Sequence, residues 1–175
     1  MLVPKTLDSD EECIRCLLHP LMYSVRRKKL NHPAILPPPN SNKVSLLRLK
    51  YSNDGLDFCI KHGQSLSVKN NEFVGLAIIT PDAVQKCNQI HKDQHPTGFV
   101  QAEIKYAPMN KGEYVDTSID IDTNDPNIDL PMHADLTYNN LDGEDVKTAL
   151  RMYANELLKQ MKFAIFENGS LDERR

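Results

Sequence analysis

The run from Phe73 to Thr80, FVGLAIIT, contains almost no polar side chain and constrains the fold more than any other segment. A strand with one wet face alternates apolar and polar residues, whereas a strand covered on both faces is apolar throughout. The run is also far shorter than the roughly 18–20 apolar residues of a membrane-spanning helix. It therefore predicts a central strand that needs a packed layer on each side.

Other segments carry strand or helix patterns around this run. Val100, Ala102, Ile104 and Tyr106 alternate with polar residues, and Ala134, Leu136 and Tyr138 do the same, as in strands with one buried face. Strands are predicted over 44–51, 63–68, 73–80, 99–106 and 133–138. Together with helices, they predict one α+β domain over 1–175. Its sheet is mixed or antiparallel, with about four to six strands.

Three helices are predicted from caps and apolar spacing. Ser9 and Glu12 fit a capping box for a helix over 9–19. Thr80 and Pro81 fit the N-cap and first position of a helix to about His91. The third and longest helix is expected over 142–167, because its apolar residues recur three and four positions apart. Loop-like or poorly ordered segments are expected at 1–8, 110–130 and 170–175.

Composition and charge make several classes of function less favoured. The net charge of −3 gives no overall attraction to nucleic acid or to an anionic membrane. Trp is absent and aromatic residues make up 6%, which disfavours a protein that stacks bases. We expect a cytoplasmic protein without a membrane segment, whose four cysteines are reduced. A protein partner is favoured, and nucleic acid is left open as a less favoured one.

Two cysteine-containing pairs have the spacing of zinc ligands. Cys13 and Cys16 form one pair, and Cys59 and His62 form the other. The first pair falls in the predicted 9–19 helix, where both thiols also fit an apolar stripe. Buried thiols and an unrelated surface histidine are the competing interpretation, and the one we favour. No resident cofactor is therefore expected, and zinc is kept as an alternative.

The residues Pro81-Asp82 and Glu103-Ile104-Lys105 resemble the PD-(D/E)xK pattern of restriction-type nucleases. That resemblance implies two acids holding Mg²⁺ and a lysine that helps to activate water. Asp82, Glu103 and Lys105 would be the catalytic residues. The chain departs from the pattern in that Asp82 starts a predicted helix, where an acid also stabilises the helix dipole.

A second polar pair lies on the predicted strand over 133–138. His133 and Asp135 are two positions apart, so both point to the same face. Such a pair can orient a base or bind a ligand. A histidine on an ordinary sheet surface is the competing interpretation. The chain has none of the nucleophile or phosphate-binding motifs that would complete a catalytic set.

A docking surface is predicted from the segment that follows the first helix. Arg26 and Arg27 begin a basic patch, and Ile35, Leu36, Pro37 and Pro38 lie in a proline-rich loop. Prolines favour the stiff polyproline II conformation, which presents exposed side chains at low entropic cost. We therefore expect Ile35 and Leu36 to be exposed contacts for a protein partner.

The order of these features resembles small bacterial proteins of uncharacterised function. The resemblance spans residues 20–138 and uses Arg26, the 33–39 loop, Ser45-Leu46 and the Pro-x-His-Ala segment at 131–134. It implies an accessory protein that belongs to a bacterial multi-protein system, and it carries no known activity. A binding protein is our first prediction, a Mg²⁺-dependent nuclease the second, and a zinc-stabilised module the third.

Overall fold

A computed structural model describes most of the chain, namely residues 1–95, 99–118, 120–139, 141, 145–167 and 170–174. Within these residues, seven strands form one sheet in the order β13-β12-β6-β2-β5-β11-β7, and every neighbouring pair is antiparallel. In that order the strands are Ser170–Arg174, Lys162–Glu167, Glu72–Ile79, Cys13–His19, Lys43–Arg48, His133–Asn139 and Gln101–Tyr106. The predicted α+β class is confirmed, with an antiparallel sheet larger than expected.

Smaller elements surround this sheet. Two-stranded pairs join β1 (Leu2–Val3) to β10 (Ile121–Asp122), β3 (Tyr23–Ser24) to β4 (Lys29–Leu30), and β8 (Met109–Asn110) to β9 (Glu113–Tyr114). The helices are α1 (Leu56–Ser65), α2 (Pro81–Gln94) and α3 (Val146–Gln160), with 3-10 turns η1 (His32–Ala34) and η2 (Leu49–Tyr51). The segments expected to be loop-like therefore contain short strands. β1 lies within 1–8, β9 and β10 lie within 110–130, and residues 170–174 form β13.

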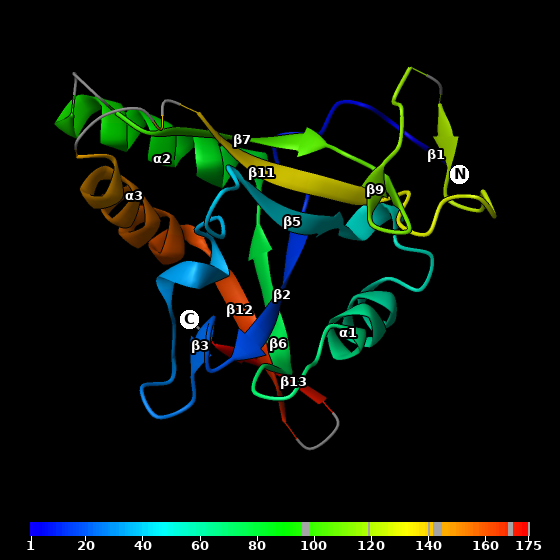
Figure 1. The fold of residues 1–175 in the computed structure, drawn as a ribbon, viewed down its shortest axis with the longest axis horizontal. Coiled ribbons are helices and arrows are strands. Elements are labelled where there is room, and N and C mark those ends of the chain that lie inside the picture. The colour runs from blue at the N-terminus through cyan, green and yellow to red at the C-terminus, as the bar shows by residue number, and fades with distance from the viewer. Residues whose placement is uncertain (96–98, 119, 140, 142–144, 168–169, 175) are drawn as a thin grey trace.

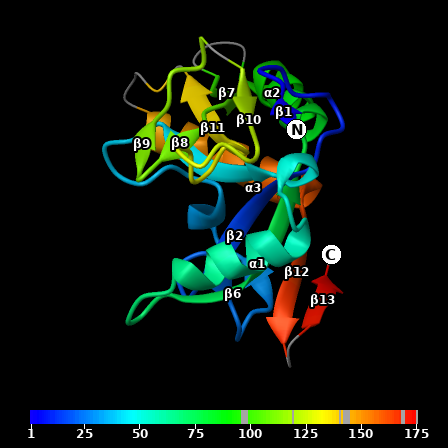
Figure 2. The ribbon, with the colours of Figure 1, turned by 90° about the vertical axis from the view of Figure 1, so that its right-hand side faces the viewer.

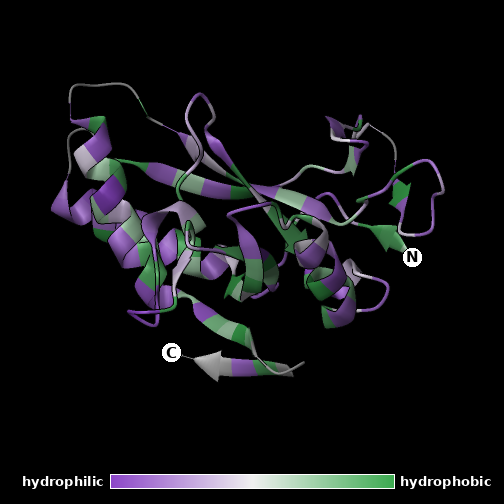
Figure 3. Ribbon diagram, turned by 60° about the horizontal axis from the view of Figure 1, so that its bottom comes forward, coloured by the Kyte–Doolittle hydropathy of each residue, from purple (hydrophilic) through white to green (hydrophobic). Residues whose placement is uncertain are grey.

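Helices cover both faces of the sheet (Figure 1). Helices α2 and α3 pack on one face, in a core that includes Ala77 of β6, while α1 lies across β2 and β6 on the other face (Figure 2). Hydrophobic and hydrophilic residues alternate around the helical turns (Figure 3). Leu76, next to Ala77, belongs to the second core. Strand β6 is therefore the doubly covered central strand that its apolar run predicts.

The start of α2 follows its predicted signals. The Thr80 hydroxyl accepts a hydrogen bond from the Ala83 N–H at 3.2 Å, and Pro81 occupies the first turn. Val84, Cys87 and His91 face the core. Strand β11 is also confirmed, but the prediction that only one of its faces is buried is wrong, because residues 133 to 138 are all buried.

The predicted helix over 9–19 is wrong, because residues 13–19 form strand β2. β2 pairs with β5 and β6, and these long-range hydrogen bonds outweigh the local capping signal at Ser9. The Ser9 carbonyl instead accepts a hydrogen bond from the Asp82 N–H at 2.8 Å. The predicted 63–68 strand is wrong as well, since helix α1 runs to Ser65.

The third helix is shorter than predicted. α3 ends at Gln160, and residues 162–167 form strand β12, which pairs with β6 through residues 162–165. Phe163 and Ile165 alternate with polar or less buried neighbours, so the segment satisfies a strand period as well as a helical one. Residues 142–144, where this helix is predicted to begin, lie outside the described residues. Longest among the described helices, α3 is followed by two strands.

The sheet depends on a buried ion pair between β5 and the N-terminal segment. Arg48 and Glu11 have side-chain exposures of 0% and 2%. The guanidinium donates to both Glu11 carboxylate oxygens and to the carbonyls of Pro4 and Thr6. It also lies over the Tyr51 ring, 4.5 Å from its centroid. Arg48 thereby ties the N-terminal segment from Pro4 to Glu11 to the end of β5 and to Tyr51 of η2.

At the β7 edge of the sheet, a side chain takes the place of a further strand. The Asn88 amide of α2 donates to the Ala102 carbonyl at 2.8 Å and accepts from the Ala102 N–H at 3.0 Å. Its oxygen also accepts from the Tyr153 hydroxyl at 2.8 Å. An edge covered in this way offers less template for pairing with another chain.

We expect Glu11→Gln to lower the free energy of unfolding by about 3–5 kcal/mol, because it leaves the Arg48 charge buried without a carboxylate. Urea denaturation measures the change. Glu12→Gln is the control, since Glu12 is exposed and adjacent; it should change the value by less than about 0.5 kcal/mol. Equal effects of the two variants would contradict this role for Glu11.

Asn88→Ala should cost about 3 kcal/mol, because three buried polar groups lose their partner at once. It should also promote aggregation through the uncovered β7 edge. Chemical denaturation and light scattering measure the two effects. Gln89→Ala, on the exposed side of the same helix, is the control. An unchanged midpoint for Asn88→Ala would show that Ala102 does not depend on this amide.

Candidate functional site

A groove of about 990 Å³ lies between the β3–β4 hairpin and α3, and we call it the basic groove. The hairpin and α3 lie on the same side of the molecule, at the left of Figure 1. The volume of the basic groove is at the upper end of the range usual for ligand pockets. Its lining residues are Leu21, Arg27, Lys28, Lys29, Leu30, Asn31, His32, Pro33, Asn155, Glu156, Leu158, Lys159 and Phe163.

Hydrogen bonds hold the walls of the basic groove in place. The Asn31 amide donates to the carbonyls of Pro20 and Leu21 at 3.0 and 3.2 Å, and its oxygen accepts from Arg27 at 3.1 Å. Across the groove, the His32 ring and the Asn155 side chain are hydrogen bonded at 2.8 Å. The hairpin and α3 are thus both tied to the segment between them.

The hairpin is anchored in the core as well as at its surface. Tyr23 of β3 is 1% exposed, and its ring lies 6.0 Å from that of Phe163 in β12. Phe163 and the partly buried Leu30 and Leu158 give the basic groove an apolar floor. Leu21, which is 48% exposed, adds an open apolar side chain at the rim.

The charge of the basic groove is opposite to that of the whole chain. Its lining contains four cationic side chains and one carboxylate, while the chain carries −3. Lys159 is paired with that carboxylate, Glu156, at 2.6 Å. Among the described residues, Lys28 and Lys29 have no ion pair or side-chain hydrogen bond. Arg26 beside them is exposed and likewise unpaired.

The predicted docking loop is only partly at the surface. Ile35 is 1% exposed, and its carbonyl accepts a hydrogen bond from the Tyr138 hydroxyl at 2.7 Å. Leu36 is half-buried against the same core, while Pro37 is half-buried and Pro38 is exposed. The expectation that Ile35 and Leu36 are exposed contacts is therefore wrong. The turn η1 folds the loop back onto the sheet, and the basic residues before it form the open surface.

His133 and Asp135 share one face of β11, as the strand spacing predicts, and the structure shows that both are buried, with side-chain exposures of 3% and 2%. The His133 Nδ1 lies 2.6 Å from the Ala107 carbonyl oxygen. Because a carbonyl only accepts, Nδ1 carries the proton and Nε2 is a bare acceptor in the neutral ring. Nε2 faces Asp135 Oδ1 at 3.9 Å, and neither atom has a hydrogen-bond partner among the described residues.

Two further residues hold the other oxygen of Asp135. The Tyr114 hydroxyl of β9 donates to Oδ2 at 2.7 Å, and Lys43 Nζ of β5 lies 3.5 Å from it. Burial and the carboxylate raise the pKa of Tyr114 to about 12, so it remains a donor at neutral pH. Neither Tyr114 nor Lys43 was predicted from the sequence. Lys43 begins β5 opposite Thr137 of β11, and no local sequence pattern reveals that register.

The sheet separates Cys13 from the other three proposed zinc ligands. Residues three apart on a strand point to opposite faces, so Cys13 lies in the core beneath α2 and α3, and Cys16 in the core beneath α1. The Cys16 thiol donates to the Cys59 carbonyl, and burial raises the pKa of Cys13 and Cys16 to about 12. His62 stacks on Phe58 at the outer side of α1.

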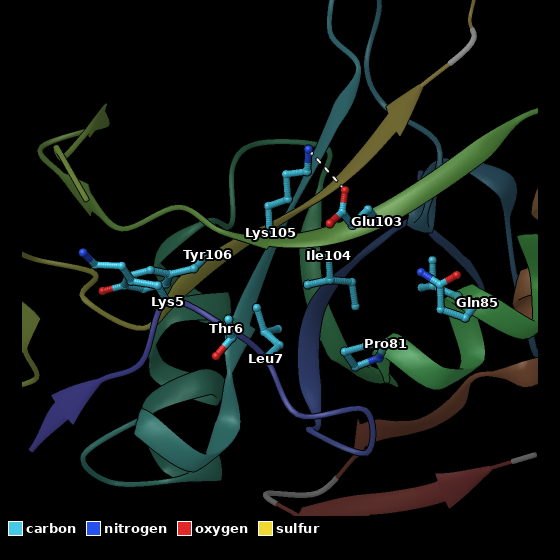
Figure 4. Close-up of a pocket in the computed structure, with 10 residues that line it drawn as sticks. Lys5, Thr6, Leu7, Pro81, Gln85, Glu103, Ile104, Lys105 and Tyr106 are labelled. Carbon is cyan, nitrogen blue, oxygen red and sulfur yellow. Dashed lines mark ion pairs between the residues drawn. The ribbon is translucent and has the colours of Figure 1, made fainter. Parts of the chain in front are cut away.

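The proposed nuclease residues form two separate ion pairs. Asp82 pairs with Lys86 at 2.7 Å, and Glu103 pairs with Lys105 at 3.2 Å. Figure 4 shows Glu103 and Lys105 pointing away from Pro81 and Gln85 of α2. Ile104, which lies between them in β7, faces that helix. Among the described residues, no three His, Cys, Asp or Glu side chains are grouped as metal ligands.

The buried imidazole makes stability sensitive to acid. Burial lowers the pKa of His133, outweighing the Ala107 carbonyl and the Asp135 carboxylate, which favour the charged ring. The unfolded chain therefore binds a proton more readily than the folded one below about pH 6.5. Stability from this group is complete above that pH and falls as the pH is lowered.

We expect His133→Gln to reduce the dependence of unfolding free energy on pH below 6.5, the ordinary pKa of histidine. One such group contributes at most about 1.4 kcal/mol per pH unit. Denaturation at a series of pH values measures the slope, whatever the absolute stability of the variant. His62 and His91, whose pKa values burial also lowers, leave a remaining slope. A slope identical to that of the wild type would contradict the prediction.

Comparison with known proteins gave no match to a protein-family model, to a curated protein or to a solved structure. The resemblance to small bacterial proteins therefore stays a prediction. None of the helices described here has both the length and the apolar character needed to cross a membrane. The basic groove and the buried His133–Asp135 pair are the two features from which a function can be argued.

Proposed function

We propose that this chain is a docking protein that binds a segment of a partner protein in the basic groove. It acts without catalysis and without a resident cofactor, as an accessory subunit of a bacterial multi-protein system in the cytoplasm. The observation that carries the proposal is the pairing of an open apolar floor with lysines that have no partner in the described chain.

Both halves of that observation favour a protein ligand. Apolar surface beside Leu21, Leu30 and Leu158 gains free energy when a partner removes it from water. Polar groups at the rim, such as the bonded His32 and Asn155, give a bound segment orientation. A rigid groove also costs less conformational entropy on binding than a flexible loop does.

Neither alternative in the sequence has comparable support. The nuclease residues Asp82, Glu103 and Lys105 are already engaged in local ion pairs. The thiols of Cys13 and Cys16 point into different cores. His133 and Asp135 are buried beneath Tyr114, so they are not open to a large ligand.

Asn155→Trp tests the docking function, because an indole at this exposed position fills the basic groove. We expect it to remove at least about 90% of the partner captured by the wild type, a loss of about 1.4 kcal/mol or more. The measurement is quantitative mass spectrometry of proteins cross-linked to the whole chain in its own cells.

Lys147→Trp is the matched control, since Lys147 is exposed on the same helix and does not line the basic groove. It should retain the partner. Circular dichroism checks that both variants keep the wild-type fold. If Asn155→Trp captures the same proteins in the same amounts as Lys147→Trp, the groove is not the docking site.

A further inference from the structure

We infer that the segment bound in the basic groove is acidic, with carboxylates on either side of a large apolar residue. This inference rests on the docking function and names the chemistry of the partner. The inference is drawn from the positions of charged side chains around the apolar floor. The docking function by itself does not specify the chemistry of the bound segment.

The cations of the basic groove differ in how free they are. Arg27 is held by Ser24 and by the Asn31 oxygen, so it belongs to the wall. Lys28 and Lys29 are exposed, and both lack a carboxylate partner among the described residues. Flexible ammonium groups of this kind attract carboxylates without demanding one geometry. They are the first contacts available to an acidic segment.

The opposite wall offers a cation that can change partner. Lys159 is 65% exposed, and its bond to Glu156 joins neighbouring turns of α3. An exposed pair of this type contributes little to stability, so a carboxylate from another chain can compete for the lysine. Cations thus lie on both sides of the apolar floor. A bound segment that has carboxylates on both sides of one apolar residue matches this arrangement.

The floor favours a peptide over a nucleic acid. Single-stranded nucleic acids bind through bases stacked on exposed aromatic rings. The aromatic residue of the basic groove, Phe163, is only 9% exposed and packs against Tyr23. Leu21 and Leu158 instead present aliphatic surface, which suits a leucine, methionine or phenylalanine side chain. The net charge of −3 also repels a long polyanion.

Peptide display with the whole chain tests the inference. A library of short random peptides is selected on the wild type and on two double variants of equal net charge. Lys28→Glu/Lys29→Glu reverses the groove lysines. Lys61→Glu/Lys69→Glu reverses two exposed lysines elsewhere. All four positions are on the surface, so both variants should fold.

We expect peptides retained by the wild type and by Lys61→Glu/Lys69→Glu, but lost from Lys28→Glu/Lys29→Glu, to be rich in Asp and Glu around one large apolar residue. A synthetic peptide of this kind should bind Lys28→Glu/Lys29→Glu at least about tenfold more weakly, and high salt should weaken its binding to the wild type. Fluorescence anisotropy measures both effects.

Other outcomes separate the inference from the docking function. Neutral or basic peptides that compete with one another and are blocked by Asn155→Trp would overturn the acidic chemistry and leave docking intact. Failure to select any peptide that Asn155→Trp blocks would overturn both. Tighter lysine-dependent binding of single-stranded RNA or phosphatidylserine vesicles than of any selected peptide would overturn the inference in favour of those ligands.

Discussion

The buried charge of Arg48 imposes the strongest constraint on this fold. A guanidinium without solvent is costly unless its donors are satisfied, and here two carboxylate oxygens and two backbone carbonyls satisfy them. The carbonyls belong to Pro4 and Thr6, so the extended N-terminal segment must pass over β5. Because Arg48 also contacts the rings of Tyr51 and Tyr106, it fixes η2 and the end of β7.

The rest of the sheet follows from how its two faces and its edge are covered. Alternate residues of β2 and β6 enter different cores, which is why helices are needed on both sides. Gly75 lets β12 lie close, since a Cβ there would come 2.2 Å from the Ala164 carbonyl oxygen. At β7 the Asn88 amide replaces a neighbouring strand. These features cover both faces of the sheet and its β7 edge.

The β3–β4 hairpin and α3 form the side of the molecule that carries the basic groove. The hairpin is held by Tyr23 beneath and by Asn31 at its base, so its lysines are presented on a firm support. The buried His133–Asp135 pair is a different kind of feature. It is enclosed by Tyr114 and Lys43, and its effect is on stability against acid. The groove proposed to bind a partner and the buried pair that affects acid stability thus lie in separate parts of the molecule.

The sequence by itself determined the elements whose pattern has only one local solution. The apolar run ending at Ile79 can be only a doubly covered strand, Thr80-Pro81 starts a helix by its own chemistry, and the alternation from His133 sets β11. The pairing of His133 with Asp135 followed from that alternation.

Tertiary structure decided the segments that satisfy two patterns equally well. Residues 13–19 became strand β2 because β5 and β6 supply hydrogen bonds on both sides, and 162–167 became β12 through pairing with β6. Ile35 is buried in the core, where its carbonyl accepts a hydrogen bond from Tyr138, 103 residues away. The basic groove joins residues 21–33 to 155–163, and no local signal encodes that approach. Contacts between segments far apart in the chain fix it.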